Sequence, residues 1–428
     1  MIGGKKALST QAWQRNENFV LDFLREIYQE TLTRSAPSLL LGGALAREES
    51  RGLHTLPVNV VALGKAAFSL AAAATELLHV ERIFIAAPRG YGKTATVRKD
   101  AEIELGAHPY PDADSFRSGQ RLIDFVRASS DPILFLISGG SSACVELPLH
   151  PWINQSELTQ VHIQLLRAGL DIEQINTVRK HLSALKGGRL GALAPLGSRT
   201  YIYSDVSTGK ERLVGSGPTL PDASRNEDAA SILRGLDSPF CREIAGRLSD
   251  DRMPDTPATF PHADPVLIAD NRNLVERAGG LIEASGRPHR IVADQIEGDV
   301  GDAAARLLEF VASAERGTVV VAGGEPTVRV TGEGVGGRCS ELAVRFALAY
   351  ELPGNCFGIF GSSDGVDGNT GAAGVVISTE PARSVSRADF QTACQQSDTF
   401  NLACRLGQAL RVETTGNNLR DLYLLVRD

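Results

Sequence analysis

Short apolar runs alternate along the chain with longer segments of helical periodicity. The runs are rich in Val, Ile and Leu, are too short for helices, and are apolar at both odd and even positions. This pattern is typical of strands that are buried on both faces of a parallel sheet. The expected strands are Val58–Leu63, Arg82–Ala87, Ile133–Ile137, Thr200–Tyr203, Pro265–Ala269, Thr318–Ala322, Cys356–Phe360, Gly374–Ser378 and Leu422–Val426.

The longer segments predict helices, and the alternation of strands with helices predicts a layered α/β architecture. Asp114 or Ser115 and Asn176 are the expected N-caps, because short polar side chains accept hydrogen bonds from the first free amides of a helix. The expected helices are Asn18–Arg34, Ala66–Leu78, Asp114–Arg127, Asn176–Ala194 and Glu341–Tyr350.

A polar, proline-rich stretch between residues 236 and 264 interrupts the alternation. A chain of 428 residues is long enough for two or three domains, each with its own core. Because domain boundaries fall in such linkers, we expect an N-terminal domain at residues 1–250 and a C-terminal domain at residues 251–428.

Composition narrows the class of partner. The net charge is −7 and no Lys/Arg-rich run is present, which argues against nucleic acid and anionic membrane as partners. The six cysteines are scattered without metal-binding spacing and are expected to be reduced thiols. No N-terminal apolar signal segment and no membrane-length apolar stretch is evident, so we expect a cytoplasmic protein.

Five expected strands run directly into glycine, serine or acidic residues, in VNVVALGK, ILFLISGGSS, TYIYSDV, TVVVAGGE and CFGIFGSSDG. Ligands of open parallel sheets bind at the carboxyl ends of the strands. These five ends therefore predict a composite ligand site.

The run Ser138-Gly139-Gly140-Ser141-Ser142 follows one of these strands. Its consecutive amides and hydroxyls suit a carboxylate or a phosphate, although a tight structural turn has the same composition. It lacks the phosphate-loop pattern GxxxxGK[ST].

Lys65 follows Gly64 at the end of another strand. Its ammonium is suited to neutralising a phosphoryl group in transfer, and the alternative is a solvated lysine in the first turn of a helix.

Asp205 ends a third strand, where an aspartate can hold Mg²⁺, act as a base, or only cap a turn. The later loop Gly215-Ser216-Gly217-Pro218-Thr219 is suited to backbone contacts with an anion.

Glycine is densest between Gly323-Gly324-Glu325 and Gly336-Gly337-Arg338, around an expected short strand VRV. Arg338 opens an apolar helix there, and its guanidinium can clamp phosphate or carboxylate. The alternative is a loose β-hairpin with a surface arginine.

Asp364-Gly365 and Asp367 follow the next strand and suit Mg²⁺ or a nucleotide, or form an Asp/Gly-rich turn. The spacing is not that of an EF-hand. The lone histidines, such as His108 and His181, are expected to be structural.

The motifs together resemble those of class II glycerate kinases, the glycerate 2-kinases of the MOFRL family. The resemblance spans about residues 20 to 426 and rests on VALGKAA, GAHPYPDADS, LISGGSSA, INTVRKHLSALKGGRL, YSDV, GSGPTLPD, GGEPTVRV, GEGVGGRCSELA, GSSDGVDGNTGAAG and TTGNNLRDLYLLV.

The resemblance implies an N-terminal Rossmann-like domain with a parallel sheet and flanking helices, a C-terminal α/β MOFRL domain, and an active site in the interdomain cleft. It also implies a kinase that uses ATP and Mg²⁺ and phosphorylates the 2-hydroxyl of glycerate to give 2-phosphoglycerate. The partners would be ATP and a small hydroxy acid, with a homodimer left open.

The resemblance implies a role for each motif residue. Lys65, Arg338 and Asp205 are the expected catalytic residues, and Asp205 with Asp364 would hold the metal. The residues expected to bind substrate or phosphate are Ser138, Gly139, Gly140, Ser141, Ser142, Gly217 and Glu325. The residues expected to bind nucleotide are Gly336, Gly337, Asp364 and Gly365.

Four positions depart from the family pattern. Ser141 replaces a third glycine, Lys210-Glu211 follow the SDV motif, Cys339-Ser340 replace an Asn-Gln pair, and Ser362-Ser363 precede Asp364. We expect these to leave the fold intact and to shift the choice among small hydroxy acids. Three alternatives stay open: a kinase for another aldonate, a hydroxypyruvate reductase, and a non-catalytic ligand sensor. The reductase is disfavoured, because GKAAFSL after Val58–Leu63 lacks the GxGxxG fingerprint.

Overall fold

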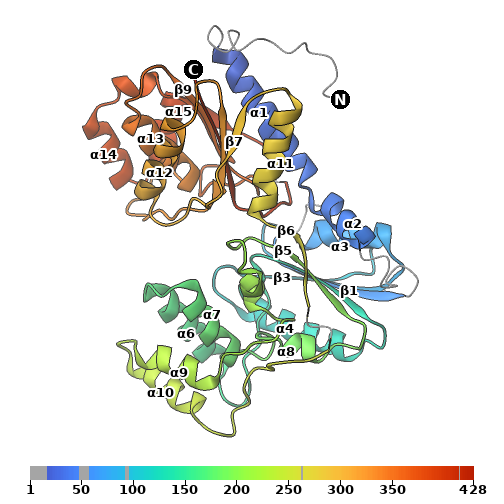
Figure 1. Ribbon diagram of the computed structural model, residues 1–428. Coiled ribbons are helices and arrows are strands. Elements are labelled where there is room, and N and C mark those ends of the chain that lie inside the picture. Colours follow the sequence, from blue (N-terminus) through green and yellow to red (C-terminus); the bar gives the residue numbers. More distant parts are fainter. Residues whose placement is uncertain (1–16, 48–56, 92–95, 262–263, 414) are drawn as a thin grey trace. The chain divides into compact units, whose positions relative to one another are not determined.

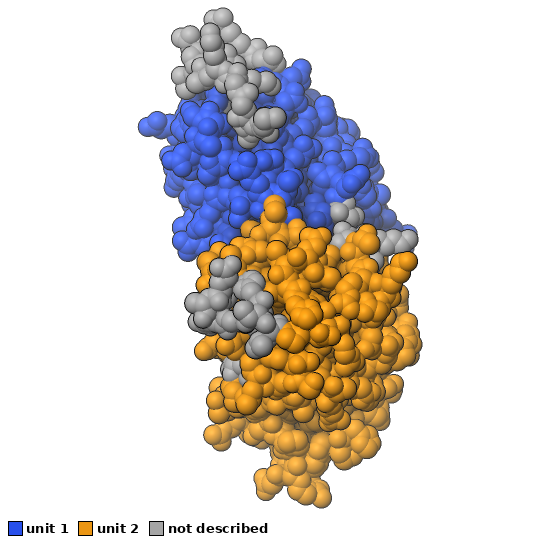
Figure 2. Space-filling model, turned by 90° about the vertical axis from the view of Figure 1, so that its right-hand side faces the viewer, with its two compact units in different colours: residues 1–36, 269–428 blue, residues 37–268 orange. Residues whose placement is uncertain are grey.

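The computed structural model describes residues 17–47, 57–91, 96–261, 264–413 and 415–428. The chain forms two compact units (Figure 2). Residues 37–268 make up one, which we name the inserted unit. Helix α1 (Glu17–Arg34) and residues 269–428 make up the other, which we name the split unit. The expected two-domain α/β architecture is therefore confirmed.

The inserted unit is built on a six-stranded sheet of strand order β3-β2-β1-β4-β5-β6. This is the order of a doubly wound Rossmann-like fold, and the pairings from β3 across to β5 are all parallel, as expected. The strands are β1 (Val58–Leu63), β2 (Val80–Pro88), β3 (Glu102–Gly106), β4 (Ile133–Ser138), β5 (Arg199–Tyr203) and β6 (Val266–Ala269).

Helices surround this sheet, and the expected helix over residues 176–194 is wrong in its bounds. Asp171 rather than Asn176 caps α7, and α7 ends at Leu182. Gly187 and Gly188, with φ of 58° and 83°, break the helical path before a last short turn. The helices are α2 (Pro37–Arg47), α3 (Ala67–Leu77), α4 (Ala113–Arg127), α5 (Ser141–Cys144), α6 (Gln155–Arg167), α7 (Ile172–Leu182), α8 (Arg189–Ala192), η3 (Glu211–Ser216), α9 (Asn226–Arg234) and α10 (Pro239–Leu248).

The N-cap of α4 also lies two or three residues earlier than expected. Asp112 accepts a hydrogen bond from the amide of Ser115 at 3.0 Å, so neither Asp114 nor Ser115 is the cap. The carboxylate of Asp112 also pairs with Arg89, which ties the start of α4 to the end of β2.

The split unit has a mixed sheet, of order β11-β10-β9-β12-β8-β7. β12 is antiparallel to both β8 and β9, and β7–β8 is a parallel pair. The expected wholly parallel pattern is therefore wrong for this half of the chain. The strands are β7 (His289–Ile291), β8 (Val319–Gly324), β9 (Cys356–Ser362), β10 (Gly374–Ser378), β11 (Gly407–Leu410) and β12 (Asp421–Arg427).

The hydrophobic pattern could not distinguish the parallel sheet from the mixed sheet, because helices cover both faces of each sheet. α1 and α11 cover one face of the second sheet, and α12, α13 and α15 cover the other (Figure 1). β9 and β10 are consequently buried along their whole length. The helices are α11 (Asn271–Ala284), α12 (Val300–Ala312), α13 (Arg338–Ala349), η4 (Pro381–Ser384), α14 (Arg387–Gln395) and α15 (Thr399–Leu406).

α1 packs on the split unit although it opens the described chain. The Tyr28 hydroxyl donates to the carbonyl of Ser362 at 2.7 Å, and the Asn417 amide donates to the carbonyl of Leu32 at 3.0 Å. The units therefore differ from the division at residue 250 expected from the linker composition. Across the ranges that the structure describes, no helix combines the length and the apolar character needed to cross a membrane.

Candidate active site

The first cluster of predicted residues lies at the carboxyl ends of β1 and β4 in the inserted unit. Strand order reverses between these neighbours, which is where doubly wound sheets bind ligands. The amide of Lys65 donates to the carbonyl of Gly139 at 2.9 Å. The Ser138 hydroxyl donates to the carbonyl of Leu63 at 3.0 Å and accepts from the amide of Ala66 at 3.1 Å. The two loops therefore form one hydrogen-bonded unit.

Gly64 makes this close approach feasible. Its φ is 105°, and a Cβ there would lie 2.5 Å from the Ser138 hydroxyl and 2.6 Å from the carbonyl oxygen of Gly139. Gly140 also has a positive φ, of 81°, and its missing side chain leaves room for the aliphatic stem of Lys65. The glycines thus set where the Lys65 side chain lies.

The hydroxyls of Ser141 and Ser142 both make polar contacts that anchor the loop after β4. The Ser141 hydroxyl donates to the carbonyl of Ser138 at 2.9 Å and is buried. Ser142 lies 3.2 Å from the hydroxyl of Ser216, which in turn donates to the Asn176 side chain at 2.6 Å. These bonds join the loop after β4 to η3 and to α7.

Two further predicted residues lie in the same unit. Asp205 follows β5 and is half-buried. Gly217, with φ of 58°, accepts a hydrogen bond from the amide of Gly188 at 2.8 Å, so it holds the turn beside α8.

The cluster is electropositive. The ammonium of Lys65 lies 5.3 Å from the centroid of the Tyr91 ring. Burial lowers the pKa of His108, and the nearby charges of Lys65 and Arg179 lower it further. His108 is therefore a neutral imidazole at pH 7 beside two cations.

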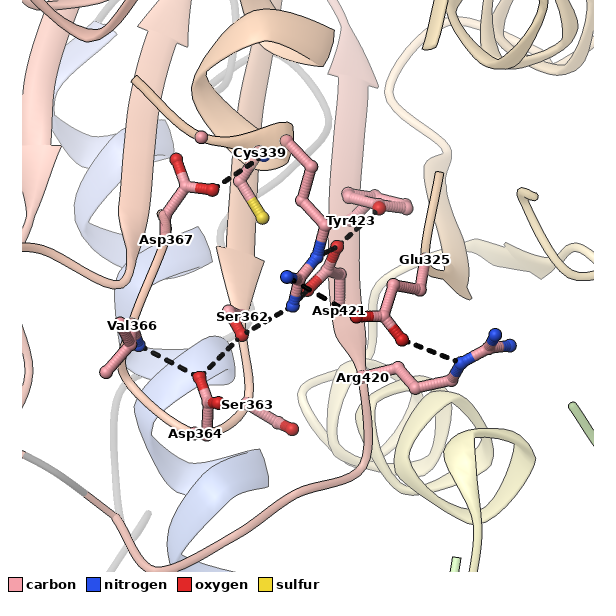
Figure 3. A network of polar contacts seen from close by, with 12 residues as sticks. Glu325, Cys339, Ser362, Ser363, Asp364, Val366, Asp367, Arg420, Asp421 and Tyr423 are labelled. Atoms are coloured by element: carbon pink, nitrogen blue, oxygen red, sulfur yellow. Dashed lines mark hydrogen bonds and ion pairs between the residues drawn. The ribbon is translucent and has the colours of Figure 1, made fainter. Parts of the chain in front are cut away.

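The second cluster lies in the split unit, around Arg338 at the first position of α13 (Figure 3). Its guanidinium donates from Nε and Nη2 to the two carboxylate oxygens of Asp421, each at 2.8 Å. Nη2 also donates to the Ser362 hydroxyl at 3.2 Å, and Tyr423 donates to Asp421 at 3.0 Å. Burial lowers the pKa of Arg338, but Asp421 and Glu325 outweigh burial and raise it, so this arginine stays charged.

Sheet topology explains why Asp421 lies beside Arg338. Because β12 runs antiparallel between β8 and β9, its first residue, Asp421, lies opposite Gly324 and Ser362 at their carboxyl ends. Glu325 follows β8 and lies 3.3 Å from a guanidinium nitrogen of Arg338. Arg420 pairs with Glu325 at 3.2 Å, and also with Glu297.

A cavity of about 600 Å³ opens beside these charges. Glu325, Arg338 and Arg420 contribute to its wall, and the glycine-rich segment lines much of the rest. The expected strand VRV is not formed, and this segment is not a loose hairpin: the amide of Gly334 donates to the carbonyl of Gln396 at 2.8 Å. The lining residues from this segment are Pro326, Thr327, Val328, Arg329, Val330, Gly332, Glu333, Gly334, Gly336 and Gly337.

The aspartates of the 364–367 turn are not among the described residues that line this cavity. Asp364 accepts hydrogen bonds from the Ser362 hydroxyl at 2.8 Å and from the amide of Val366 at 2.9 Å. Gly365, with φ of 86°, continues that turn. Asp367 accepts from the amides of Cys339 and Ser340 and so caps α13, and burial raises its pKa to about 6. Gly336 and Gly337, which were expected to bind nucleotide, therefore line the cavity. Asp364 and Gly365, which were expected to do the same, form a turn that does not line it.

Sequence reasoning did not single out Asp421, Arg420 or Glu297. Asp421 and Arg420 stand directly before the last apolar run, which is the one local signal that marks them.

The sequence of this chain matches two protein families and is similar to enzymes of known activity. Residues 23–246 match the family described as "Domain of unknown function (DUF4147)", and residues 318–421 match the MOFRL family. D-glycerate 2-kinase of Thermotoga maritima is 31% identical, over 86% of this chain and 90% of its own. Glycerate 2-kinase of Pyrococcus horikoshii is also 31% identical, over 86% of this chain and 87% of its own.

The fold agrees with these matches. The crystal structure of a glycerate kinase from Thermotoga maritima superposes with a TM-score of 0.81 at 27% identity, covering 96% of this chain and all of that one. The resemblance expected from the motifs is confirmed, and the chain belongs to the glycerate 2-kinase family, with its DUF4147 and MOFRL regions in order.

Proposed function

We propose that the chain transfers the γ-phosphoryl group of ATP to the 2-hydroxyl of glycerate, giving ADP and 2-phosphoglycerate. The observation that carries this is the cavity beside Arg338, which combines three arginine side chains, those of Arg329, Arg338 and Arg420, with a wall of glycine-rich backbone. Such a wall lets phosphates approach amide groups closely, and guanidiniums bind phosphate oxygens in pairs. The relatives named as glycerate kinases support the same activity.

The residues divide between two ligands in this proposal. The nucleotide occupies the cavity of the split unit, with Gly336 and Gly337 along its phosphates. The hydroxy acid binds at the loops after β1 and β4, beside Lys65. The 2-hydroxyl oxygen attacks the γ-phosphorus, the bond to the bridging oxygen of ADP breaks, and the hydroxyl proton passes to a carboxylate. Lys65 and Arg338 stabilise the charge of the transferring group, and Asp205 is the candidate base.

Magnesium would enter with the nucleotide. Among the residues that the structure describes, no three His, Cys, Asp or Glu side chains are grouped to hold a metal. This fits Mg²⁺, which in such enzymes takes one or two carboxylates together with substrate phosphates and water. Asp205 and Asp364 are the candidate ligands, and Oδ1 of Asp364 also accepts two hydrogen bonds in its own turn. The ion would neutralise phosphate charge.

The alternatives predict different chemistry. A hydroxypyruvate reductase would bind a dinucleotide after β1, where Gly64-Lys65-Ala66-Ala67 offers one glycine rather than three. A kinase for a longer aldonate would use the same groups. The Ser141 hydroxyl, which the departure from the family pattern added, donates to backbone, and this favours the ordinary substrate over a changed one. Cytoplasmic location and a homodimer stay predictions.

The test is an assay of ADP formation from ATP and Mg²⁺ with D-glycerate, L-glycerate, hydroxypyruvate, tartronate and erythronate, with NAD(P)H oxidation followed in parallel. Phosphorus NMR of the product separates the 2-phosphate from the 3-phosphate. We expect ADP with glycerate and the 2-phosphate as product. If ADP forms with erythronate alone, the substrate is the four-carbon acid rather than glycerate. If NAD(P)H is oxidised with hydroxypyruvate and no ADP forms with any acid, the proposal is overturned.

A matched pair of variants tests the site. Arg338→Met should lower turnover by at least about 100-fold, because the charge that faces the phosphates is lost. Arg272→Met is the control, since Arg272 forms a surface pair with Glu276 at 2.9 Å. Equal turnover in the two variants would place the reaction elsewhere.

A further inference from the structure

A buried group of charged side chains lies in the inserted unit between α7 and the segment after α5. The ammonium of Lys186 lies 2.6 Å from Oε2 of Glu146, and both side chains are almost fully buried. Oε1 of Glu146 accepts from the Ser183 hydroxyl at 2.5 Å and from the amide of Leu147 at 2.9 Å. Glu146 is thus satisfied by one cation and two further donors.

Arg179 adds a second cation to this group without a second carboxylate. It is 8% exposed, and its Nε has no hydrogen-bond partner among the described residues. Burial lowers its pKa, with Glu146 as the carboxylate that opposes this. His162, beside it, is neutral because burial holds its pKa well below the usual value. Two cations against one carboxylate leave one positive charge uncompensated, which is costly in a buried position.

The position of Arg179 links this charge to the ligand loops. Arg179 lies one helical turn after Asn176 on α7, so the two share a face. Asn176 accepts from the Ser216 hydroxyl at 2.6 Å, and Ser216 contacts Ser142 in the loop after β4. Besides burial, the positive charges of Lys65 and Arg179 lower the pKa of His108, so both cations lie near this imidazole. Arg179 therefore stands at the cluster that holds Lys65.

We infer that Arg179 binds the carboxylate of the hydroxy acid substrate. A carboxylate supplies the one negative charge that the group lacks, and a guanidinium binds it through two parallel hydrogen bonds. This leaves the ammonium of Lys65 for the phosphoryl group. The inference rests on the proposed function, since that function places the acid at these loops.

The test compares Arg179→Met, Arg179→Lys and wild type in KM for D-glycerate, KM for ATP, and thermal melting without ligand. Arg179→Met should raise the KM for D-glycerate about 100-fold and leave the KM for ATP within about twofold. Arg179→Lys should recover part of the loss. The unliganded Arg179→Met protein should melt no lower than wild type, because it loses an uncompensated buried charge.

Arg189→Met is the matched control. Arg189 donates to the carbonyl of Pro254 at 2.8 Å and so ties α8 to a loop. Its loss should lower the melting temperature and leave the KM for D-glycerate unchanged. If Arg179→Met instead melts lower and keeps its KM for D-glycerate within twofold, Arg179 is structural and the inference is wrong.

A binding measurement separates this inference from the proposed function. If the wild type forms no ADP with any acid, the proposed function fails, and thermal melting with D-glycerate or with uncharged glycerol still tests Arg179. Stabilisation by D-glycerate alone, lost in Arg179→Met, supports the inference. No stabilisation, or equal stabilisation of Arg179→Met, overturns it.

Discussion

Gly64→Ala is expected to damage the inserted unit far more than an ordinary glycine substitution. Two costs are combined at this position. The first is backbone strain, because a φ of 105° is unfavourable for alanine. The second is overlap, because the new Cβ would lie 2.5 Å from the Ser138 hydroxyl and 2.6 Å from the carbonyl oxygen of Gly139, against about 3.5 Å for a comfortable contact.

Gly90→Ala separates the two costs. Gly90 has a φ of 97°, close to that of Gly64, and its Cβ would meet no atom of the described residues within 4 Å. Gly90→Ala should therefore lower the free energy of unfolding by the strain alone, about 1–2 kcal/mol. Gly64→Ala should add the overlap, which costs about 2–3 kcal/mol in a packed site, for a total of about 3–5 kcal/mol.

The chain offers a fluorescent reporter of this unit. It has two tryptophans, and Trp152 lies in the inserted unit, whereas Trp13 lies outside the described residues. Urea unfolding of both variants in a Trp13→Phe background therefore follows Trp152. Gly64→Ala should also lower turnover at temperatures where it stays folded, because Lys65 is displaced. Free energies of unfolding of the two variants that agree within about 0.5 kcal/mol would refute the close packing of the two loops.

Three other changes test the charged residues. Asp421→Asn should lower the free energy of unfolding by about 3 kcal/mol, because it breaks a buried ion pair. Tyr423→Phe, which removes one hydrogen bond to the same carboxylate, should lower it by about 1 kcal/mol. Equal losses of the two variants in urea unfolding would contradict the pairing. Because the folded pKa of Asp367, about 6, exceeds the unfolded value of about 3.9, the folded state binds this proton more tightly, and stability from this group falls as pH rises through that window. The unfolding free energy of the wild type minus that of Asp367→Asn should thus fall by about 2–3 kcal/mol between pH 4 and pH 7, and a difference that does not vary with pH would disprove the shift. Lys65→Met should lower turnover at least about 100-fold with melting unchanged, whereas Lys99→Met, at an exposed position, should keep turnover within twofold; near-normal turnover in Lys65→Met would exclude its role.

The nine strands predicted from buried apolar runs all form, because burial on both faces leaves a pattern that local sequence reveals, whereas the short strand expected at VRV does not form. The three strands that were missed, β3, β7 and β11, lie at sheet edges and are short or partly exposed. In β3 the pattern is reversed, since Ile103 and Leu105 are exposed and Glu104 is buried against Arg121. Hydrophobic periodicity has no means of detecting such a strand.

The candidate site was partly predictable for a similar reason. Glycine and serine loops carry a local signal, so Lys65, Arg338 and the loop after β4 could be singled out as candidates from the sequence. Asp421 was missed because its partner, Arg338, is 83 residues away and the two meet only through the antiparallel register of β12. Arg179 stood in the sequence only as part of the motif INTVRKHLSALKGGRL, because the shortage of carboxylates around it exists in three dimensions alone.

The division of the split unit has a consequence for synthesis of the chain. The apolar face of α1 includes Val20, Leu24 and Ile27, all buried in the finished fold. Its partners in the sheet, β9 and β12, come late in the chain, and β12 ends at Arg427. At about 5–20 residues per second, a ribosome needs roughly 20–80 s to reach them, and the inserted unit has time to fold first. During that interval β9 and β12 do not yet cover α1, so the nascent chain exposes part of the apolar face of this helix until both strands have emerged.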